Sequence, residues 1–561
     1  YLYAYARDKL LKIDKDTGTV LREGTMAGTS SFAINNSTYA EGMILVGLSN
    51  GRIQAFNADT LESLWLYTDP LGGQPDCPIT VSDGYAYTGF WNSEIKNASF
   101  VCISLTDEDP GEAKEAKAPT WRYVQKGGFY WAGAYVCRDY VLVGTDDGKS
   151  GYTSKTANVL LLDPMSGKLL DSMTGFAGDI RSTICYDEAT NAFYFDSKGS
   201  YFYRVRVRKD TDGAWKLTDR AELPIGGMST STPVIANGRA YIGVCGSGQF
   251  TEYSGHSITV IDLSGAMSIA YRAETQGYPQ TSGLLTTGYD NYNYIYFLDN
   301  YTPGTLRVLR DKEGQTEADY TTIERVGEGK TEKTYTTAYA LFTPAGEQAQ
   351  YCICSPIVDE NGTLYFKNDS GYLMAFGRSI EKIEVTTMPK KTKYAAGETF
   401  DKTGMVVTAT LTDGSTRDVT DMVSAPSEPL ADGTEEITLE FGRGQTMYRN
   451  LPAGDKMSTG NNVTSITTTI PIHVGDTTET GALTDDITWS FRPAANTLSI
   501  DGEIPEGHKV LIACYDENGM LTKLEVLTIS GSVKLPDSAR IRVFYIDGDS
   551  KPLCAAATVL E

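Results

Sequence analysis

Histidine is scarce in this chain of 561 residues, which contains only His256, His473 and His508. The three are so far apart that they fall into different predicted domains. No zinc site with several histidines and no histidine-based catalytic triad can therefore be assembled within one domain. The nine cysteines include no CxxC pair and no two adjacent cysteines, and those inside apolar strands behave as small buried hydrophobes. We predict no metal site.

Long apolar runs and basic runs are also missing. No stretch approaches the roughly 20 apolar residues that span a bilayer, so the sequence predicts no transmembrane segment. The net charge is −23, and no basic run offsets it. Because phosphate groups repel such a chain, we expect neither nucleic acid nor an anionic membrane as a partner.

The sequence does contain a repeated strand, which is short and apolar and is followed by a turn. It occurs eight times, with successive copies 43 to 67 residues apart, at Leu10–Asp14, Ile53–Asn57, Phe100–Ser104, Val159–Asp163, Tyr203–Val207, Ile258–Asp262, Leu306–Arg310 and Leu373–Gly377. A β-unit of roughly 40–50 residues that is repeated many times is typical of a propeller.

Further strands precede most copies. One is a second apolar strand, as at Met43–Gly47, joined to the repeated strand by a glycine turn such as Asn50-Gly51. Before it comes a strand with small residues, expected at Ser31–Ile34, Cys77–Thr80, Ala132–Tyr135, Ser182–Cys185, Ser231–Val234, Ser282–Leu285 and Ser355–Val358. Small side chains suit the innermost strand of a blade, where neighbouring sheets crowd around the axis. We therefore predict an all-β chain in which residues 1–378 form a β-propeller of eight blades, with seven as the alternative.

Two turns, Asp14-Lys-Asp-Thr-Gly18 and Asp163-Pro-Met-Ser-Gly167, together with Asn57-Ala-Asp-Thr60, resemble the repeats of the quinoprotein-like, PQQ-repeat family of propellers. The resemblance covers roughly Tyr1 to Gly377 and implies the propeller fold. Enzymes of this family hold PQQ with a tryptophan below, a vicinal disulfide above, and a calcium bound by Glu, Asn and Asp. Because this chain has no adjacent cysteines, the resemblance favours the non-enzymatic members. We predict no catalytic residue and no cofactor, with PQQ and calcium left open.

The remainder of the chain reads as two small β-sandwiches, residues 379–475 and 481–561. The series Tyr394-Ala-Ala-Gly-Glu-Thr-Phe400, followed by the strand Gly404–Gly414, resembles the bacterial Ig-like family of cell-surface repeats. Residues 442–462 are expected to be an inserted loop. The last module is similar to carboxy-terminal modules of secreted proteins from Gram-positive gut bacteria. These resemblances imply an extracellular or cell-surface protein, with the signal segment absent from this chain, which opens partway through a blade.

The residues that open each inner strand are expected to face the mouth of the central channel. In order they are Ser30, Asp76, Tyr130, Trp131, Asp179, Arg181, Ser229, Thr230, Tyr278, Gln280, Gln350 and Tyr351. Aromatic faces beside amides, hydroxyls and an arginine suit a sugar or another neutral polar ligand. The alternative is that these groups hold one another and ordered water in a sealed channel.

Trp131 and Arg181 are expected to lie closest to such a ligand. Gly127 and Gly128 let the backbone turn sharply before Trp131, and Asp179 would orient the guanidinium of Arg181. On this hypothesis Arg181→Ala weakens binding and leaves the fold intact.

The sequence thus favours an extracellular, non-catalytic binding or adhesion protein. Its propeller would present a surface to a polar small molecule, a glycan or a protein. Two alternatives stay open: a PQQ-dependent or other channel-centred propeller enzyme, and a scaffold in envelope assembly.

Overall fold

The computed structural model describes residues 1–15, 18–30, 37–152, 154–246, 255–289, 291–325, 332–377, 380–411, 414–441, 446–447, 458–459, 466–475 and 478–560. In these ranges the helical elements are three short 3-10 turns, η1 (Gly346–Gln348), η2 (Thr420–Met422) and η3 (Pro493–Ala495), and all other elements are strands. The all-β prediction is confirmed. No helix among them is long and apolar enough to cross a membrane. The chain divides into two compact units, one with residues 1–377 and 444–460, the other with residues 378–443 and 461–561.

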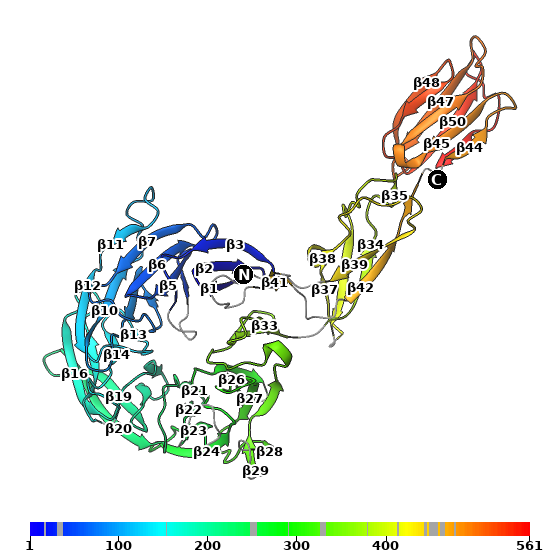
Figure 1. The fold of residues 1–561 in the computed structure, drawn as a ribbon. Coiled ribbons are helices and arrows are strands. Elements are labelled where there is room, and N and C mark those ends of the chain that lie inside the picture. The colour runs from blue at the N-terminus through cyan, green and yellow to red at the C-terminus, as the bar shows by residue number, and fades with distance from the viewer. Residues whose placement is uncertain are drawn as a thin grey trace. The chain divides into compact units, whose positions relative to one another are not determined.

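Eight antiparallel sheets follow one another along residues 1–377 (Figure 1). The first sheet contains β1 (Leu2–Ala6), β2 (Lys9–Ile13) and β3 (Val20–Thr25). The second contains β4 (Thr38–Ala40), β5 (Met43–Leu48), β6 (Arg52–Asn57) and β7 (Ser63–Thr68), with β11 (Glu115–Lys117) added in parallel. The third contains β8 (Thr80–Ser82), β9 (Tyr85–Gly89), β10 (Asn97–Ser104) and β12 (Trp121–Lys126), and the fourth contains β13 (Tyr135–Val136), β14 (Val141–Gly144), β15 (Ala157–Leu162) and β16 (Leu169–Phe176).

The last four sheets continue the same order. The fifth sheet contains β17 (Cys185–Asp187), β18 (Ala192–Ser197), β19 (Tyr201–Lys209) and β20 (Trp215–Pro224). The sixth contains β21 (Val234–Ala236), β22 (Arg239–Val244), β23 (Ser257–Asp262) and β24 (Ser268–Glu274). The seventh contains β25 (Leu284–Tyr289), β26 (Tyr292–Leu298), β27 (Leu306–Asp311) and β30 (Tyr339–Phe342), and the eighth contains β31 (Ile357–Val358), β32 (Leu364–Lys367) and β33 (Leu373–Phe376). A hairpin of β28 (Tyr320–Arg325) and β29 (Glu332–Thr337) lies between β27 and β30 in sequence.

Each repeated strand of the sequence is a strand of its own sheet. The eight copies correspond to β2, β6, β10, β15, β19, β23, β27 and β33. Strands such as β6 and β15 are buried on both faces because neighbouring sheets pack face to face. In one such layer Val159 and Leu161 of β15 are buried against Phe193, Phe195 and Tyr203 of the next sheet. The pattern that indicated a propeller thus comes from burial of both faces.

The innermost strands begin later than the sequence predicts. The predicted strands Cys77–Thr80, Ala132–Tyr135 and Ser182–Cys185 correspond to β8, β13 and β17, which start only at the last residue of each prediction. The same shift, by two residues or more, holds for β21, β25 and β31, and the predicted strand Ser31–Ile34 lies outside the described residues. The residues before each strand are irregular because their neighbours lie too close: a Cβ on Gly133 would come within 2.3 Å of Thr183 Oγ1.

Hydrogen bonds join these inner segments from one sheet to the next. Thr38 Oγ1 donates to Ile79 O (2.9 Å), Thr80 Oγ1 to Ala134 O (3.2 Å), Ile184 N to Gly133 O (3.4 Å), Thr183 N to Thr232 Oγ1 (3.1 Å), Ser231 Oγ to Thr281 O (2.9 Å) and Thr281 Oγ1 to Cys354 O (3.1 Å). The small residues expected at the axis are therefore largely hydroxyl donors and acceptors, and they link seven successive segments.

The last sheet also contacts the first. Lys15 Nζ lies 3.1 Å from Asp359 Oδ2, and the Tyr365 hydroxyl donates to Lys15 O at 3.2 Å. Figure 1 shows β33 and β1 on the same side of the ring of sheets. The two ends of the repeated region are thus brought together by polar contacts.

The second unit holds two sandwiches with separate cores. The first contains β34 (Ile380–Thr387), β35 (Lys393–Tyr394), β36 (Val406–Leu411), β37 (Thr416–Asp418), β38 (Val423–Ser424), β39 (Glu436–Phe441), β42 (Ile466–Pro471) and β43 (His473–Val474). The second contains β44 (Glu479–Ala482), β45 (Thr488–Arg492), β46 (Thr497–Asp501), β47 (Lys509–Tyr515), β48 (Leu521–Leu527), β49 (Gly531–Lys534), β50 (Arg540–Ile546) and β51 (Ala557–Leu560). Most of the predicted loop 442–462 lies outside the described residues, apart from the paired strands β40 (Thr446–Met447) and β41 (Ser458–Thr459).

Core packing between sheets predicts a large cost for a cavity at Leu161, which is fully buried. We expect Leu161→Ala to lower the free energy of unfolding by about 2–5 kcal/mol. Leu169→Ala is the matched control, because Leu169 lies on the next strand of the same sheet and is 39% exposed. Urea unfolding followed by tryptophan fluorescence suits the test, since five of the six tryptophans lie in the first unit. Equal effects of the two changes would contradict the assigned packing.

Candidate functional site

The candidate site is built around a buried arginine. Arg181 lies between β16 and β17, and its side chain is 6% exposed. Its Nε donates to Asp146 Oδ1 at 3.1 Å and its Nη2 to Asp146 Oδ2 at 2.8 Å, while the same Nη2 lies 2.9 Å from Asp179 Oδ2. The expected orientation of Arg181 by Asp179 is confirmed. Asp146, directly after β14, is a second carboxylate that sequence reasoning did not place in the site.

Burial dominates the electrostatics of this cluster. It raises the pKa of Asp146 to about 7, against the opposing effect of Arg181, and it also raises the pKa of Asp179. Burial alone would lower the pKa of Arg181, but the two carboxylates outweigh it, so the pKa of the guanidinium is raised. Lys198 Nζ lies 3.9 Å from Asp179, and its pKa is lowered by burial and by Arg181. Arg181 therefore remains the cation that holds the cluster.

Three aromatic rings stack beside the guanidinium. Arg181 Cζ lies 4.5 Å from the ring centroid of Tyr130, at cation–π distance. Tyr130 stacks on Trp131 with centroids 4.5 Å apart and contacts Trp91 at 4.6 Å. The indole N–H of Trp91 donates to Asp146 Oδ2 at 2.9 Å, which ties the stack to the ion pair. Tyr130 is buried, whereas both tryptophans are partly exposed, and the three residues Trp91, Tyr130 and Trp131 are called the tryptophan stack.

The loop before Trp131 is shaped as its glycines predict. Gly127 and Gly128 have φ of 84° and 68°, and a Cβ on Gly128 would lie 2.7 Å from that of Ala98. Trp131 itself has φ of 61°, a left-handed conformation that a bulky residue rarely adopts. Strained backbone of this kind is concentrated at functional sites.

Two ionisable groups lie at the margin of the stack. Glu94 Oε1 is 3.7 Å from Arg181 Nη2, and its side chain is 28% exposed. Tyr152, which is 39% exposed, has Lys198 Nζ 3.8 Å from its ring centroid. The margin therefore adds a carboxylate, an amine and a further aromatic ring to the tryptophan stack.

Of the predicted site residues, the structure brings Tyr130, Trp131, Asp179 and Arg181 into direct contact. Asp76 is nearby and buried, and after burial itself it is the largest influence raising the pKa of Tyr130. Sequence reasoning missed Trp91, Glu94 and Asp146. Trp91 and Asp146 each come two residues after the glycine that ends a second strand, Gly89 of β9 or Gly144 of β14. That shared position could have identified them, because it lies next to the inner segment of the following blade.

The other predicted site residues belong to a second group further along the chain. Tyr278 is fully buried, and its hydroxyl accepts a hydrogen bond from Thr230 N at 2.7 Å. Ser229 Oγ donates to Gly243 O at 2.7 Å, and Gln280 Oε1 accepts from Asn300 Nδ2 at 2.7 Å. Gln350 is exposed, and its carbonyl accepts from Asn368 Nδ2 at 3.4 Å. The side chains of Tyr278, Ser229 and Gln280 thus form hydrogen bonds with nearby backbone and side-chain groups.

A buried carboxyl belongs to this second group. Asp196, at the end of β18, is fully buried. Burial raises its pKa well above the usual range, and the hydroxyls of Ser229 and Ser182 offset only part of that effect. The carboxyl therefore keeps its proton to a higher pH in the folded protein than in the unfolded chain.

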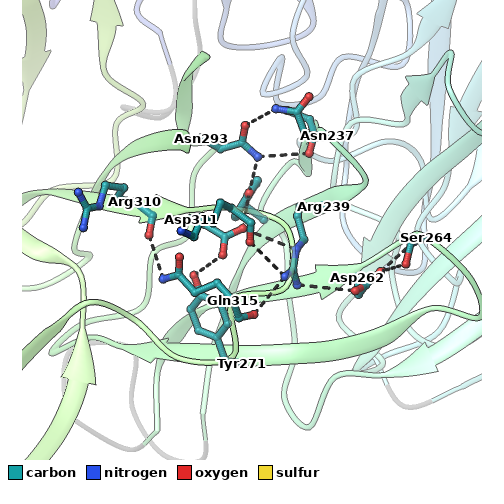
Figure 2. Close-up of polar contacts among 12 residues, drawn as sticks. Asn237, Arg239, Asp262, Ser264, Tyr271, Asn293, Arg310, Asp311 and Gln315 are labelled. Atoms are coloured by element: carbon teal, nitrogen blue, oxygen red, sulfur yellow. Dashed lines mark hydrogen bonds and ion pairs between the residues drawn. The ribbon is translucent and has the colours of Figure 1, made fainter. Parts of the chain in front are cut away.

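Figure 2 shows a third polar cluster, which joins the sheet of β22 to that of β27. Asp311 accepts hydrogen bonds from the hydroxyls of Tyr241 (2.7 Å) and Tyr271 (2.8 Å), and Arg239 Nε lies 3.8 Å from it. Arg239 also donates to the carbonyls of Lys312 and Gln315. Because both oxygens of Asp311 accept hydrogen bonds within the cluster and Asp311 is fully buried, the cluster serves to join blades.

Within the described ranges, no group of three or more His, Cys, Asp or Glu side chains is arranged to hold a metal ion. The candidate site is thus an aromatic and ionic surface, without a metal cluster of that kind.

Comparison with known proteins adds one family. Residues 387–424 match the bacterial Ig-like domain (group 3), which confirms the Ig-like resemblance of the first sandwich. No curated protein matches the chain. Among solved structures, BamB from Moraxella catarrhalis is 13% identical, with a TM-score of 0.40, over 67% of this chain and 95% of that chain. The computationally designed protein Ika8 is 14% identical, with a TM-score of 0.37, over 61% of this chain and 96% of that chain.

The burial of Arg181 changes the expected effect of removing it. Arg181→Ala would leave Asp146 and Asp179 buried without their cation, so we expect a loss of about 3–5 kcal/mol in the free energy of unfolding. Arg208→Ala is the control, since Arg208 forms an exposed ion pair with Asp219 and should cost no more than about 1 kcal/mol. A mild effect of Arg181→Ala in urea unfolding would instead support the original expectation of an intact fold.

Asp196 predicts a pH dependence. In the unfolded chain it ionises near its ordinary pKa of 3.8, whereas the folded protein keeps the proton to higher pH. Its contribution to stability is therefore complete below that value and declines as the pH rises through the raised pKa, by up to about 1.4 kcal/mol per pH unit. Asp196→Asn lacks this decline, so its stability relative to the wild type should grow between pH 4.5 and 7.5. Asp212→Asn, at an exposed turn, should show no such trend in urea unfolding.

Proposed function

We propose that this chain is a bacterial cell-surface or envelope protein that binds a polar ligand of the glycan class at the tryptophan stack. The observation that carries the proposal is the pair of partly exposed tryptophans that both contact one buried tyrosine. The Ig-like domain matched at residues 387–424 supports a surface location. In this view the propeller binds, and the sandwiches present it.

Sugar rings suit this surface because one face carries C–H groups that pack on an aromatic ring, while the hydroxyls need donors and acceptors. The tryptophan stack supplies the aromatic part. Glu94 and Lys198 lie at its margin and can meet the hydroxyls. The strained backbone of Trp131 fixes the indole in advance, so less entropy is lost when a ligand binds.

The contacts of the buried carboxylates support a non-catalytic role for the ionic cluster. A general acid or base must be able to exchange a proton with the substrate. Asp146 and Asp179 are fully buried and committed to Arg181, which also uses its own donors on them. The ionic cluster therefore acts as the support of the aromatic surface.

Trp131→Ala should weaken glycan binding by roughly 1–3 kcal/mol, by analogy with other stacking contacts. The ligand would first be found on a glycan array, and its affinity would then be measured by calorimetry. Trp215→Ala is the matched control, because Trp215 is a partly exposed tryptophan on β20. It should leave binding unchanged, and both variants should be shown by circular dichroism to keep the all-β spectrum.

Two results would contradict the proposal: no glycan bound on the array, or a bound glycan whose affinity is the same for Trp131→Ala and the wild type. Adding PQQ with calcium and following thermal stability and dye reduction separates the enzyme alternative. Dye reduction by the protein loaded with PQQ and calcium would favour the enzyme alternative over the proposed binding function.

A further inference from the structure

The carboxy-terminal sandwich has an unusually apolar edge strand. Strand β48 lies at one end of the sheet β48-β47-β50-β51, beside β47 (Figure 1). Five large apolar residues on or next to it are exposed: Met520 (67%), Leu521 (54%), Leu524 (51%), Val526 (49%) and Ile529 (73%). The exposure is concentrated at this edge, because Leu511 of β47 and Phe544 of β50 are only partly exposed.

An edge strand has unpaired backbone donors and acceptors along its outer side. Proteins usually protect such an edge with proline, a bulge, several charges or a covering segment. Strand β48 has seven residues, no proline and one lysine, and its single irregularity in pairing with β47 lies at its start, opposite Cys514 and Tyr515. The edge is thus built to accept another strand.

The sequence of β48 is complementary to itself. The order Leu521-Thr-Lys-Leu-Glu-Val-Leu527 is symmetric in character about Leu524. If a second copy pairs antiparallel with its two-fold axis at Leu524, then Leu524 faces Leu524 and Lys523 faces Glu525 of the other copy. The dimer then gains one leucine–leucine contact at the axis and two ion pairs across the strands.

The neighbouring registers lack this match. A two-fold axis perpendicular to the sheet keeps each residue on its own face, so the axis passes through a residue and its copy. Centring it on Lys523 or Glu525 sets like charges directly opposite one another. Centring it on Thr522 or Val526 sets one of the charged residues against a leucine. Charge complementarity therefore selects the register about Leu524.

We propose that β48 is a self-association edge, where two copies of this chain pair antiparallel about Leu524 into one continuous sheet. This inference is independent of ligand binding by the propeller. Since the chain carries a net charge of −23, pairing should strengthen with moderate salt, which screens the long-range repulsion between copies.

Reversal of the charges tests the register with the full chain. In sedimentation equilibrium at about 150 mM salt, the wild type should dimerise reversibly. K523E should raise the dimer dissociation constant by about tenfold or more, because two attractive pairs become repulsive. The double change K523E/E525K restores opposite charges and should recover the wild-type constant.

The matched control is K382E on β34. Lys382 and Glu384 form an exposed ion pair two residues apart, as do Lys523 and Glu525, and β34 is also at the end of its sheet. It changes the net charge by the same amount and should leave dimerisation unaffected. Hydrogen exchange gives a second readout: amides of β48 should become more protected as concentration rises, while those of β51, at the opposite edge, should not.

Three results would overturn the proposal. The wild type could sediment as a monomer at about 100 µM, where even weak self-association is visible, as it would if another protein's strand occupies the edge. A dimer could respond equally to K523E and K382E. The double change could fail to recover dimerisation while the variant keeps its folded spectrum.

Discussion

The close approach of seven inner segments around the axis is the constraint on which the rest of the first unit depends. Not even a Cβ atom fits at Gly133, where it would lie 2.3 Å from Thr183 Oγ1, and small residues also form the row of hydroxyl and backbone contacts from Thr38 to Cys354. A polar group that is buried must find a partner, so hydroxyls serve better here than alanine would. The irregular inner segments are a consequence of that crowding.

The same crowding explains where charge is buried. Asp179 and Arg181, at the start of one inner segment, are buried, and Arg181 is held between Asp146 and Asp179. Such an arrangement contributes little net stability but strongly resists the loss of one member. Its effect is to hold side chains in place: Arg181 fixes the ring of Tyr130, and Tyr130 contacts both tryptophans. The buried ion pair thereby gives the partly exposed tryptophans a defined orientation.

The repeated strands could be predicted from the sequence, whereas the candidate site could be predicted only in part. Strands such as β6 and β15 are apolar on both faces, so their pattern depends on burial alone and can be read without a structure. The inner strands could not be located, because their start depends on contacts between blades that are far apart in sequence. For the site, the position at the start of an inner strand identified four residues that lie in contact: Tyr130, Trp131, Asp179 and Arg181. Asp146 and Trp91 needed the neighbouring blade to be in place, and the burial of Arg181 depended on both.

Trp131 is subject both to the close approach of the inner segments and to the buried ion pair of Arg181. Its backbone is left-handed at φ 61°, a conformation that glycine would adopt at less cost, and the chain has glycines at the two positions where close approach demands them, Gly127 and Gly128. A residue chosen only for the fold would follow that pattern. A tryptophan in a strained position, stacked on a buried tyrosine and partly exposed, is what the proposed ligand contact of its indole would require. The strain is supported by Tyr130, which is fixed by Arg181, so the exposed ring depends on the buried ion pair beneath it.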